Sequence, residues 1–375
     1  MPSSSLNDRY PIADGTLDGV LRGPESVIAA IPYLLGFHPQ DSLVIVWMQD
    51  RRICLTQRMD LIPVSGDLEL MSDSIAGVAS TCDADSAVGV VYGSADGTDR
   101  GWRLDVYEAV DCAIEKAGVR LIDVLHVRTD RWWSYECDEP CCPQEGRTVS
   151  PSVREQVAAL LGESGVEPAT SREAVVRSLA SDPGASAETA VRIAEGQARL
   201  EERLVQSQSS EAELEVWRDE QIARWLPVFT GTHPAEPGSE LVEIHDLLLC
   251  LADIRVRDTV LWHLASVGAT QRCMDWLVSA MRAAPAGHVA PVATCAAICA
   301  WLRGDGVRAN AALDRALIDN DRYSLAWLVG QSIAYGLPPS SWREVMGRLS
   351  ESECRNGATA PAERSDDPSD PGSPG

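Results

Sequence analysis

The residues with the most distinctive chemistry lie together in residues 131–146, with the sequence RWWSYECDEPCCPQEG. This segment combines cysteines, two adjacent tryptophans, a tyrosine and several carboxylates, a mixture that no ordinary helix or strand requires. Thiolates and imidazoles are the ligands that zinc prefers, and a C-x3-C spacing suits a pair of ligands. The candidate zinc ligands are therefore Cys137, Cys141 and Cys142. His126 or His38 could supply a fourth ligand if the fold brings either of them close.

The same thiols have two other interpretations. No C-x2-C or H-x3-H pair elsewhere completes a recognisable zinc site, and adjacent cysteines rarely bind one ion together. The thiols are therefore interpreted first as reduced structural residues in a loop that is held by proline. A redox-sensitive pair of Cys137 and Cys141 is the remaining alternative, for which the pattern supplies no specific support.

The aromatic residues beside the cysteines could form a wall that grips a ligand. Along a strand, side chains alternate between faces, so Trp133 and Tyr135 should share one face while Trp132 points to the other. Buried aromatic side chains dominate protein cores, and core packing is therefore the preferred interpretation of all three residues. A ligand-binding wall is the alternative.

His38, in the segment GFHPQD, is a further candidate as a general base or metal ligand. The simpler interpretation is a turn, in which Gly36 ends a helix, Pro39 fixes the backbone and Asp41 provides a cap. The sequence contains no G-x-S-x-G, H-E-x-x-H or phosphate-loop motif. It therefore predicts no particular catalytic residue.

Charge and lysine content argue against several classes of function. The formal net charge of −24 disfavours nucleic-acid binding, because a surface that follows phosphates needs clustered lysine and arginine. Lys116 is the only lysine, and it lies near the expected end of a helix, where a cation complements the helix dipole. Catalysis that depends on lysine is therefore not expected.

The distribution of apolar residues predicts the compartment. The first residues, MPSSSLNDRY, contain no apolar segment of a secretion signal, and no apolar run reaches about 18 residues. The sequence therefore predicts a soluble cytoplasmic protein without membrane contact. Most of its 11 cysteines should then be reduced.

Hydrophobic periodicity predicts an α/β N-terminal three-layer domain with a mixed sheet, followed by an all-α helical-hairpin region and a disordered C-terminal tail. The predicted strands are residues 42–48, 53–61, 86–93 and 120–128, with a further strand from TDRWWSYE. Helices are predicted over residues 23–36, 67–81 and 102–117. The first two strands should form a hairpin, because only a short polar turn separates them.

Changes in composition predict the domain boundaries. The predicted divisions are a flexible N-terminus (1–14), an α/β domain (15–150), a helical connecting region with a linker (151–239), helical hairpins (240–349) and a tail (350–375). The hairpins resemble HEAT and tetratricopeptide units, although a regular repeat is not established. The tail is rich in proline, glycine, serine and aspartate, a composition that cannot form a packed core.

Three blocks together resemble the actinobacterial family described as domain of unknown function 4192. The blocks are LRGPESVIAAIPYLLGFHPQDSLVIV, the cysteine-containing segment above and GDGVRANAALDRALIDNDRYSLAWLV. The resemblance covers about residues 19–348. It implies a cytoplasmic protein and brings no activity, ligand or catalytic residue.

The favoured function is a non-enzymatic binding or scaffolding protein that contacts a protein partner through its helical hairpins. It would need no cofactor, and the sequence leaves its oligomeric state open. The alternative is a metal-dependent enzyme, similar to a hydrolase, with its site near residues 131–146. That alternative rests on the carboxylates beside the thiols: Glu136, Asp138, Glu139 and Glu145.

Overall fold

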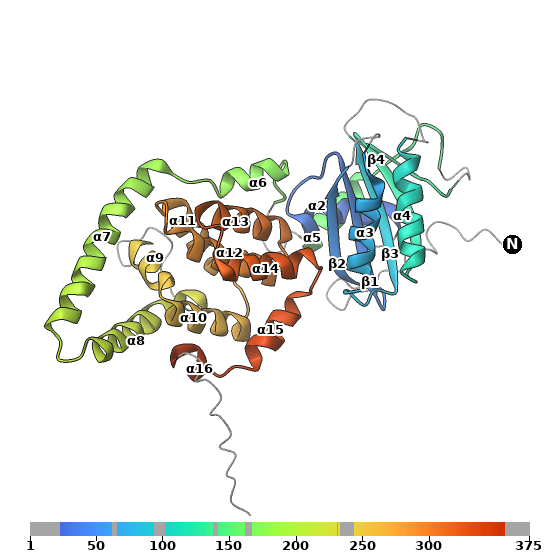
Figure 1. Ribbon diagram of the computed structural model, residues 1–375. Coiled ribbons are helices and arrows are strands. Elements are labelled where there is room, and N and C mark those ends of the chain that lie inside the picture. The colour runs from blue at the N-terminus through green and yellow to red at the C-terminus, as the bar shows by residue number, and fades with distance from the viewer. Residues whose placement is uncertain are drawn as a thin grey trace, which may run out of the picture.

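The computed structural model describes residues 23–61, 66–93, 102–137, 142–161, 167–230, 232 and 244–356. In these residues the N-terminal part forms a sheet covered by helices, and the rest of the chain is helical (Figure 1). The six strands of the sheet are β1 (Ser42–Gln49), β2 (Arg52–Asp60), β3 (Ser86–Gly93), β4 (Arg120–Arg128), β5 (Arg131–Ser134) and β6 (Arg147–Thr148). The predicted α/β part followed by a helical part is thus confirmed.

The sheet is mixed, as predicted. Its strand order is β2-β1-β3-β4-β5-β6. Strands β3 and β4 pair in parallel, and every other neighbouring pair is antiparallel. Asp50 and Arg51 join β1 to β2 and both have positive φ angles, which is the geometry that a two-residue hairpin turn favours.

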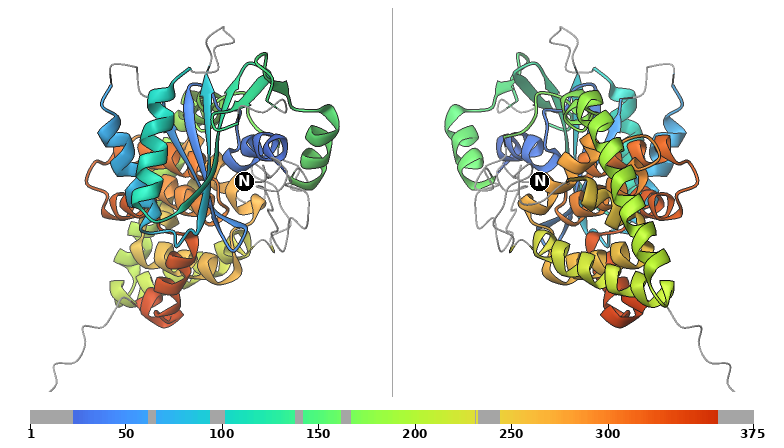
Figure 2. Two further views of the ribbon diagram at one scale, coloured as in Figure 1. Left: turned by 90° about the vertical axis from the view of Figure 1, so that its right-hand side faces the viewer. Right: turned by 90° about the vertical axis from the view of Figure 1, so that its left-hand side faces the viewer.

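Helices cover both faces of the sheet and complete three layers (Figure 2). Helices α2 (Pro24–Leu35) and α5 (Pro151–Leu161) lie on one face, and α3 (Leu68–Ala79) and α4 (Leu104–Lys116) lie on the other. The burial of strand β1 on both faces explains why its sequence is apolar without interruption. Val44 and Val46 pack under α2, while Leu43 and Ile45 pack under α3 and α4. A strand buried on both faces needs no polar positions.

We call these two apolar clusters the α2-side core and the α3-side core. The α2-side core includes Val27, Ile31, Val44, Val46, Met48, Val88, Val90, Leu125, Val127 and Trp132. The α3-side core includes Leu43, Ile45, Trp47, Ile75, Val91, Val106, Val110, Ile114 and Val124.

The helical region is built around one apolar helix. Its helices are α6 (Arg172–Ser178), α7 (Pro183–Gln206), α8 (Ser210–Phe229), α9 (Ile244–Ala252), α10 (Ile254–Val267), α11 (Gln271–Ala283), α12 (Val289–Leu302), α13 (Gly306–Asp319), α14 (Ser324–Ala334), α15 (Pro339–Gly347) and α16 (Glu351–Asn356). Helix α12 is buried on all sides, as its uniformly apolar sequence requires. Cys295 and Cys299 of α12 lie in this core with Cys250 and Cys273, the packing role that small thiols commonly have.

Two helices begin at predicted segment boundaries. Helix α5 starts just after the predicted end of the α/β domain at residue 150, yet its Val157 belongs to the α2-side core. The segment predicted as a tail from residue 350 begins with α16. Residues 357–375, most of the predicted linker and the predicted flexible N-terminus lie outside the described residues.

Strand β2 forms one edge of the sheet, and its outer side faces the helical region. A cleft of about 450 Å³ separates the two, lined by residues of β2 on one side and by residues such as Trp301, Ile333 and Leu337 on the other. Among the described helices, none has both the length and the apolar composition that crossing a bilayer requires.

Candidate functional site

The segment singled out from the sequence, residues 131–146, includes β5 and a turn that folds back on it. The Trp133 indole Nε1 donates to the Gln144 carbonyl at 3.1 Å. The Arg131 guanidinium donates to the carbonyls of Glu145 and Gly146 at 3.0 and 3.1 Å. Since these bonds satisfy the carbonyls of residues 144–146, holding this turn accounts for the presence of Trp133 and Arg131 in the segment.

The aromatic residues of β5 lie on both faces of the sheet. Trp132 belongs to the α2-side core and is 1% exposed. Trp133 is 2% exposed on the opposite face, where its ring lies 5.2 Å from that of His126. Tyr135 packs on the face of Trp133, stacks on Tyr107 at 5.2 Å and donates its hydroxyl to the Trp102 carbonyl at 2.6 Å.

The cysteines of this segment are buried where the structure describes them. Cys137 and Cys142 lie in the α2-side core, and Cys141 falls outside the described residues. His126, suggested as a fourth ligand, stacks on Trp102 at 4.9 Å on the other face of the sheet. Across the described parts of the chain, no three His, Cys, Asp or Glu residues are grouped so that they could hold a metal ion. The zinc site therefore stays a prediction.

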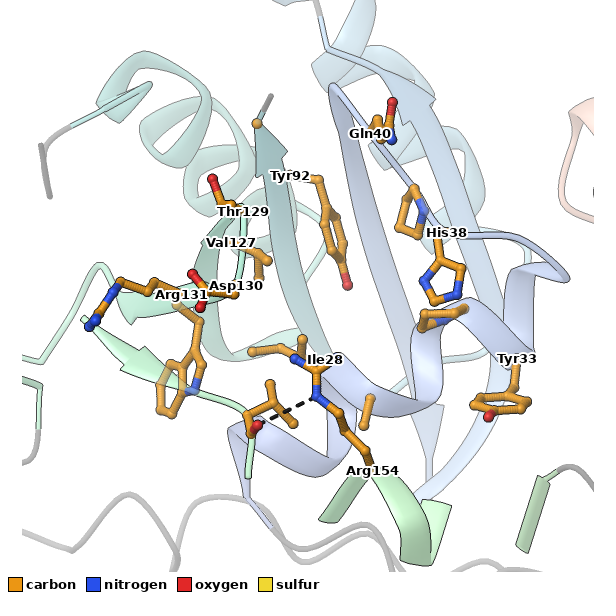
Figure 3. A pocket seen from close by; sticks show the side chains of 16 residues that line it. Ile28, Tyr33, His38, Gln40, Tyr92, Val127, Thr129, Asp130, Arg131 and Arg154 are labelled. Atoms are coloured by element: carbon orange, nitrogen blue, oxygen red, sulfur yellow. Dashed lines mark hydrogen bonds between the residues drawn. The ribbon is translucent and has the colours of Figure 1, made fainter. Parts of the chain in front are cut away.

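A cavity of about 500 Å³ lies beside this segment, where β3 and β4 end and α2 crosses the sheet (Figure 3). Its apolar wall consists of Ile28, Ala29, Pro32, Pro39, Val127, Trp132 and Val149. Its polar lining residues are Tyr33, His38, Gln40, Tyr92, Thr129, Asp130, Arg131 and Arg154. A pocket with an apolar wall and a few polar groups is the usual form of a small-molecule site, and carboxyl ends of strands are its usual place.

Glu25, in the first turn of α2, fixes the start of α5 beside the cavity. Its carboxylate accepts a hydrogen bond from the Ser150 amide at 2.9 Å and forms an ion pair with Arg147 at 3.3 Å. Arg154 lies in the first turn of α5. Its Nε donates to the Val149 carbonyl at 3.4 Å, which holds the side chain along the cavity wall.

Tyr92 brings a buried hydroxyl to the lining of the cavity. Alternation along β3 places its side chain on the α2 side, and the residue is 8% exposed. Its hydroxyl is buried and has no hydrogen-bond partner among the described residues. Burial raises the pKa of this hydroxyl above its usual range, so that it stays neutral. Figure 3 shows the hydroxyl pointing into the cavity.

His38 lies at the rim of the cavity, in the turn that the sequence predicts. Gly36 ends α2 with a φ of +76°, the left-handed conformation that glycine favours. The His38 amide donates to the Ala169 carbonyl at 2.9 Å, and the side chain is exposed. Asp130 lies on the opposite side of the cavity in Figure 3. The structure therefore does not bring these two residues together as a catalytic pair.

Sequence reasoning missed Tyr92 and Arg154. The signal for Tyr92 was a hydroxyl-bearing residue at the end of the otherwise apolar strand SAVGVVYG. No sequence signal distinguishes Arg154 from the other arginines of the chain. Its place beside Tyr92 depends on how α5 packs on α2.

The fold and the cavity define a three-layer α/β unit with a pocket at its strand ends, joined to a helical region. The chain belongs to the family described as domain of unknown function, DUF4192, whose model matches residues 24–340. This match includes both the sheet and most of the helical region. No curated protein and no solved structure matches the chain.

Proposed function

We propose that the protein is a non-enzymatic binding protein and that its ligand is a small molecule held in the cavity beside β3 and β4. The observation that carries this proposal is the buried Tyr92 hydroxyl, which has no partner among the described residues and points into the cavity. The proposal keeps the cytoplasmic location expected from the sequence.

An unsatisfied hydroxyl is costly inside a protein. Leaving a buried donor or acceptor without a partner costs about 1–3 kcal/mol, so native structures seldom contain one without a reason. A ligand atom that hydrogen-bonds to the Tyr92 hydroxyl would remove this cost. The volume of about 500 Å³ lies within the range of pockets that enclose small organic ligands.

Binding explains the lining better than catalysis does. Among the described residues that line the cavity there is no serine or cysteine, and the two other residues of a nucleophilic type, Thr129 and Asp130, are exposed. Its histidine, His38, is exposed at the rim and lies across the cavity from Asp130. The cavity can recognise a ligand through its shape and its hydrogen-bonding groups. Such recognition does not need a nucleophile and a base in contact with each other.

The test is a screen of small amphipathic molecules against the full chain by ligand-observed NMR. Ala29→Phe should fill part of the cavity and abolish binding, and Tyr92→Phe should weaken the binding of molecules that reach the hydroxyl. Tyr335→Phe changes an exposed tyrosine outside the cavity and serves as the matched control. Ligands whose binding is unaffected by Ala29→Phe would show that the cavity is not the site.

A second candidate function is the binding of a protein partner by the helical region. Trp327 and Leu328, adjacent on α14, are 56% and 57% exposed. Large exposed apolar side chains that are close in the chain can belong to an interaction surface. A Trp327→Ala, Leu328→Ala variant should keep the melting temperature of the wild type and lose the partners that affinity capture recovers. Identical partners with both proteins would contradict this role.

The metal-dependent enzyme considered from the sequence stays a prediction. It needs Cys141 and two of the neighbouring carboxylates, Asp138 and Glu139, which fall outside the described residues. The metal content of the purified protein tests it directly, as argued below.

A further inference from the structure

We propose that the ligand of the cavity is a monocarboxylate with an apolar body, held by Arg154 and Tyr92. This inference rests on the function proposed above, and it adds the chemical class of the ligand. It follows from the polar groups that face the cavity, from their charges and from the apolar character of the remaining wall.

Arg154 supplies the positive charge. It forms no ion pair with the described residues, although the chain has 56 acidic residues and only 32 basic ones. Among the described residues, the one hydrogen bond of its side chain runs from Nε to the Val149 carbonyl and leaves the terminal nitrogens of the guanidinium available. A guanidinium presents its N–H groups in a planar fork that matches a carboxylate.

Tyr92 supplies the second donor. Figure 3 shows its side chain descending from β3 and that of Arg154 rising from α5, so that the two polar ends approach the cavity from opposite sides. Because the hydroxyl stays neutral, it keeps its proton and can donate a hydrogen bond to an anion without adding a charge to the cavity. A carboxylate has two oxygens and can accept from both residues.

The charge of the lining favours one negative charge over two. Arg131 also lines the cavity, but its guanidinium is committed to the carbonyls of Glu145 and Gly146. Asp130 at the rim would repel a dianion such as a phosphate monoester. One available guanidinium and one neutral hydroxyl therefore suit a monocarboxylate.

The rest of the wall determines the body of the ligand. Ile28, Pro32 and Val127 line the cavity together with the ring of Trp132. These side chains offer no hydrogen bonds, except for the indole N–H of Trp132. An aromatic or branched aliphatic group would bury its surface against them, and burial of apolar surface is favourable.

The experiment compares carboxylates with matched neutral amides on the full-length protein. The probes are phenylacetate, 3-phenylpropanoate and 4-methylpentanoate, each paired with its primary amide. Affinities are measured by ligand-observed NMR and calorimetry at low ionic strength. At least one carboxylate should bind the wild type about tenfold or more tightly than its amide, as a charge-assisted hydrogen bond predicts.

Variants separate the two donors. Arg154→Gln should abolish the preference for the carboxylate and leave the affinity for the amide unchanged, while Arg154→Lys should retain part of the preference. Tyr92→Phe should weaken the binding of both members of a pair. Arg322→Gln removes an exposed arginine of the helical region and serves as the control. Melting temperatures confirm that each variant is folded.

The outcomes distinguish the two proposals. Amides that bind as tightly as the carboxylates, with no effect of Arg154→Gln, would overturn the ligand class and leave the cavity as a binding site. Failure of both series to bind the wild type, together with no ligand from the wider screen, would overturn the proposed function as well.

Discussion

Trp133 lies directly against Gly146, so that a Cβ atom at Gly146 would come within 2.5 Å of the indole ring. Gly146 also has a φ of +75°, a backbone conformation that residues other than glycine rarely adopt. The turn that closes residues 131–146 therefore depends on glycine for two separate reasons.

Gly146→Ala should destabilise the protein by about 2–4 kcal/mol, because strain of the backbone and overlap with the ring add together. Gly118→Ala is a matched control, since Gly118 has a φ of +72° with nothing within 4 Å of an added Cβ. The control should cost only about 1 kcal/mol. Urea unfolding of both variants measures the difference, and equal losses would show that the Trp133 contact adds nothing.

Asp319 at the end of α13 caps a different helix, the buried α12. Its carboxylate accepts hydrogen bonds from the amides of Gly287, Val289 and Ala290 at 2.6, 3.0 and 2.9 Å. Asp319→Ala should therefore lower the free energy of unfolding by about 1–3 kcal/mol, through the loss of an N-terminal cap.

Asp319→Asn should restore part of the stability, because its amide oxygen still accepts. Asp314→Ala, at an exposed position of the same helix, should have little effect. Denaturant unfolding measures all three variants. Similar effects of Asp319→Ala and Asp314→Ala would show that the cap contributes nothing.

Asp105 should make stability depend on pH in the acid range. Two hydrogen bonds from the Arg103 guanidinium, at 2.9 Å each, lower the pKa of this carboxyl. The unfolded chain then binds the proton more readily than the folded one, so the stabilisation is present above the unfolded pKa of about 3.9 and decreases as pH falls below it.

Asp105→Asn should therefore be less stable than the wild type at pH 7 and lose less stability on acidification. The midpoint of urea unfolding, measured between about pH 7 and 3, checks this prediction. Asp73→Asn, an exposed carboxylate of α3, is the control. Parallel curves for the wild type and Asp105→Asn would exclude a contribution from the ion pair with Arg103.

Cys142 tests the zinc hypothesis. Because it is buried in the α2-side core, we expect it to pack as a small apolar residue, so Cys142→Ala should cost roughly 1 kcal/mol and leave the zinc content unchanged. Metal analysis of the wild type, Cys142→Ala and Cys137→Ala checks this. One zinc per chain that is lost in either variant would instead establish the metal site.

The strands could be predicted because each carries a local pattern. Strand β1 is uninterrupted apolar sequence, and β2 follows it after a short polar turn, so that their existence and pairing depend on neighbouring residues. The strand order could not be predicted in the same way. The antiparallel pairing of Val44 with Val90 joins residues that are distant in the sequence, and no local pattern specifies their register.

The cavity could be predicted only in part. His38 and Trp132 were singled out because a lone histidine in a turn and paired tryptophans are unusual, and both line the cavity. Tyr92 and Arg154 were not, since each resembles an ordinary strand or helix residue. They face the same cavity because α5 packs against α2, and this tertiary contact cannot be read from the hydrophobic periodicity of the sequence.

The outer side of β2 faces the helical region across a cleft. A strand at the edge of a sheet has main-chain groups that can pair with a strand from another molecule. In this protein the helices occupy the approach that such a strand would need. A fragment that ended before α7 would thus expose the edge, and we would expect it to self-associate into oligomers. We therefore expect the helical region to hinder the addition of strands from neighbouring molecules to the sheet.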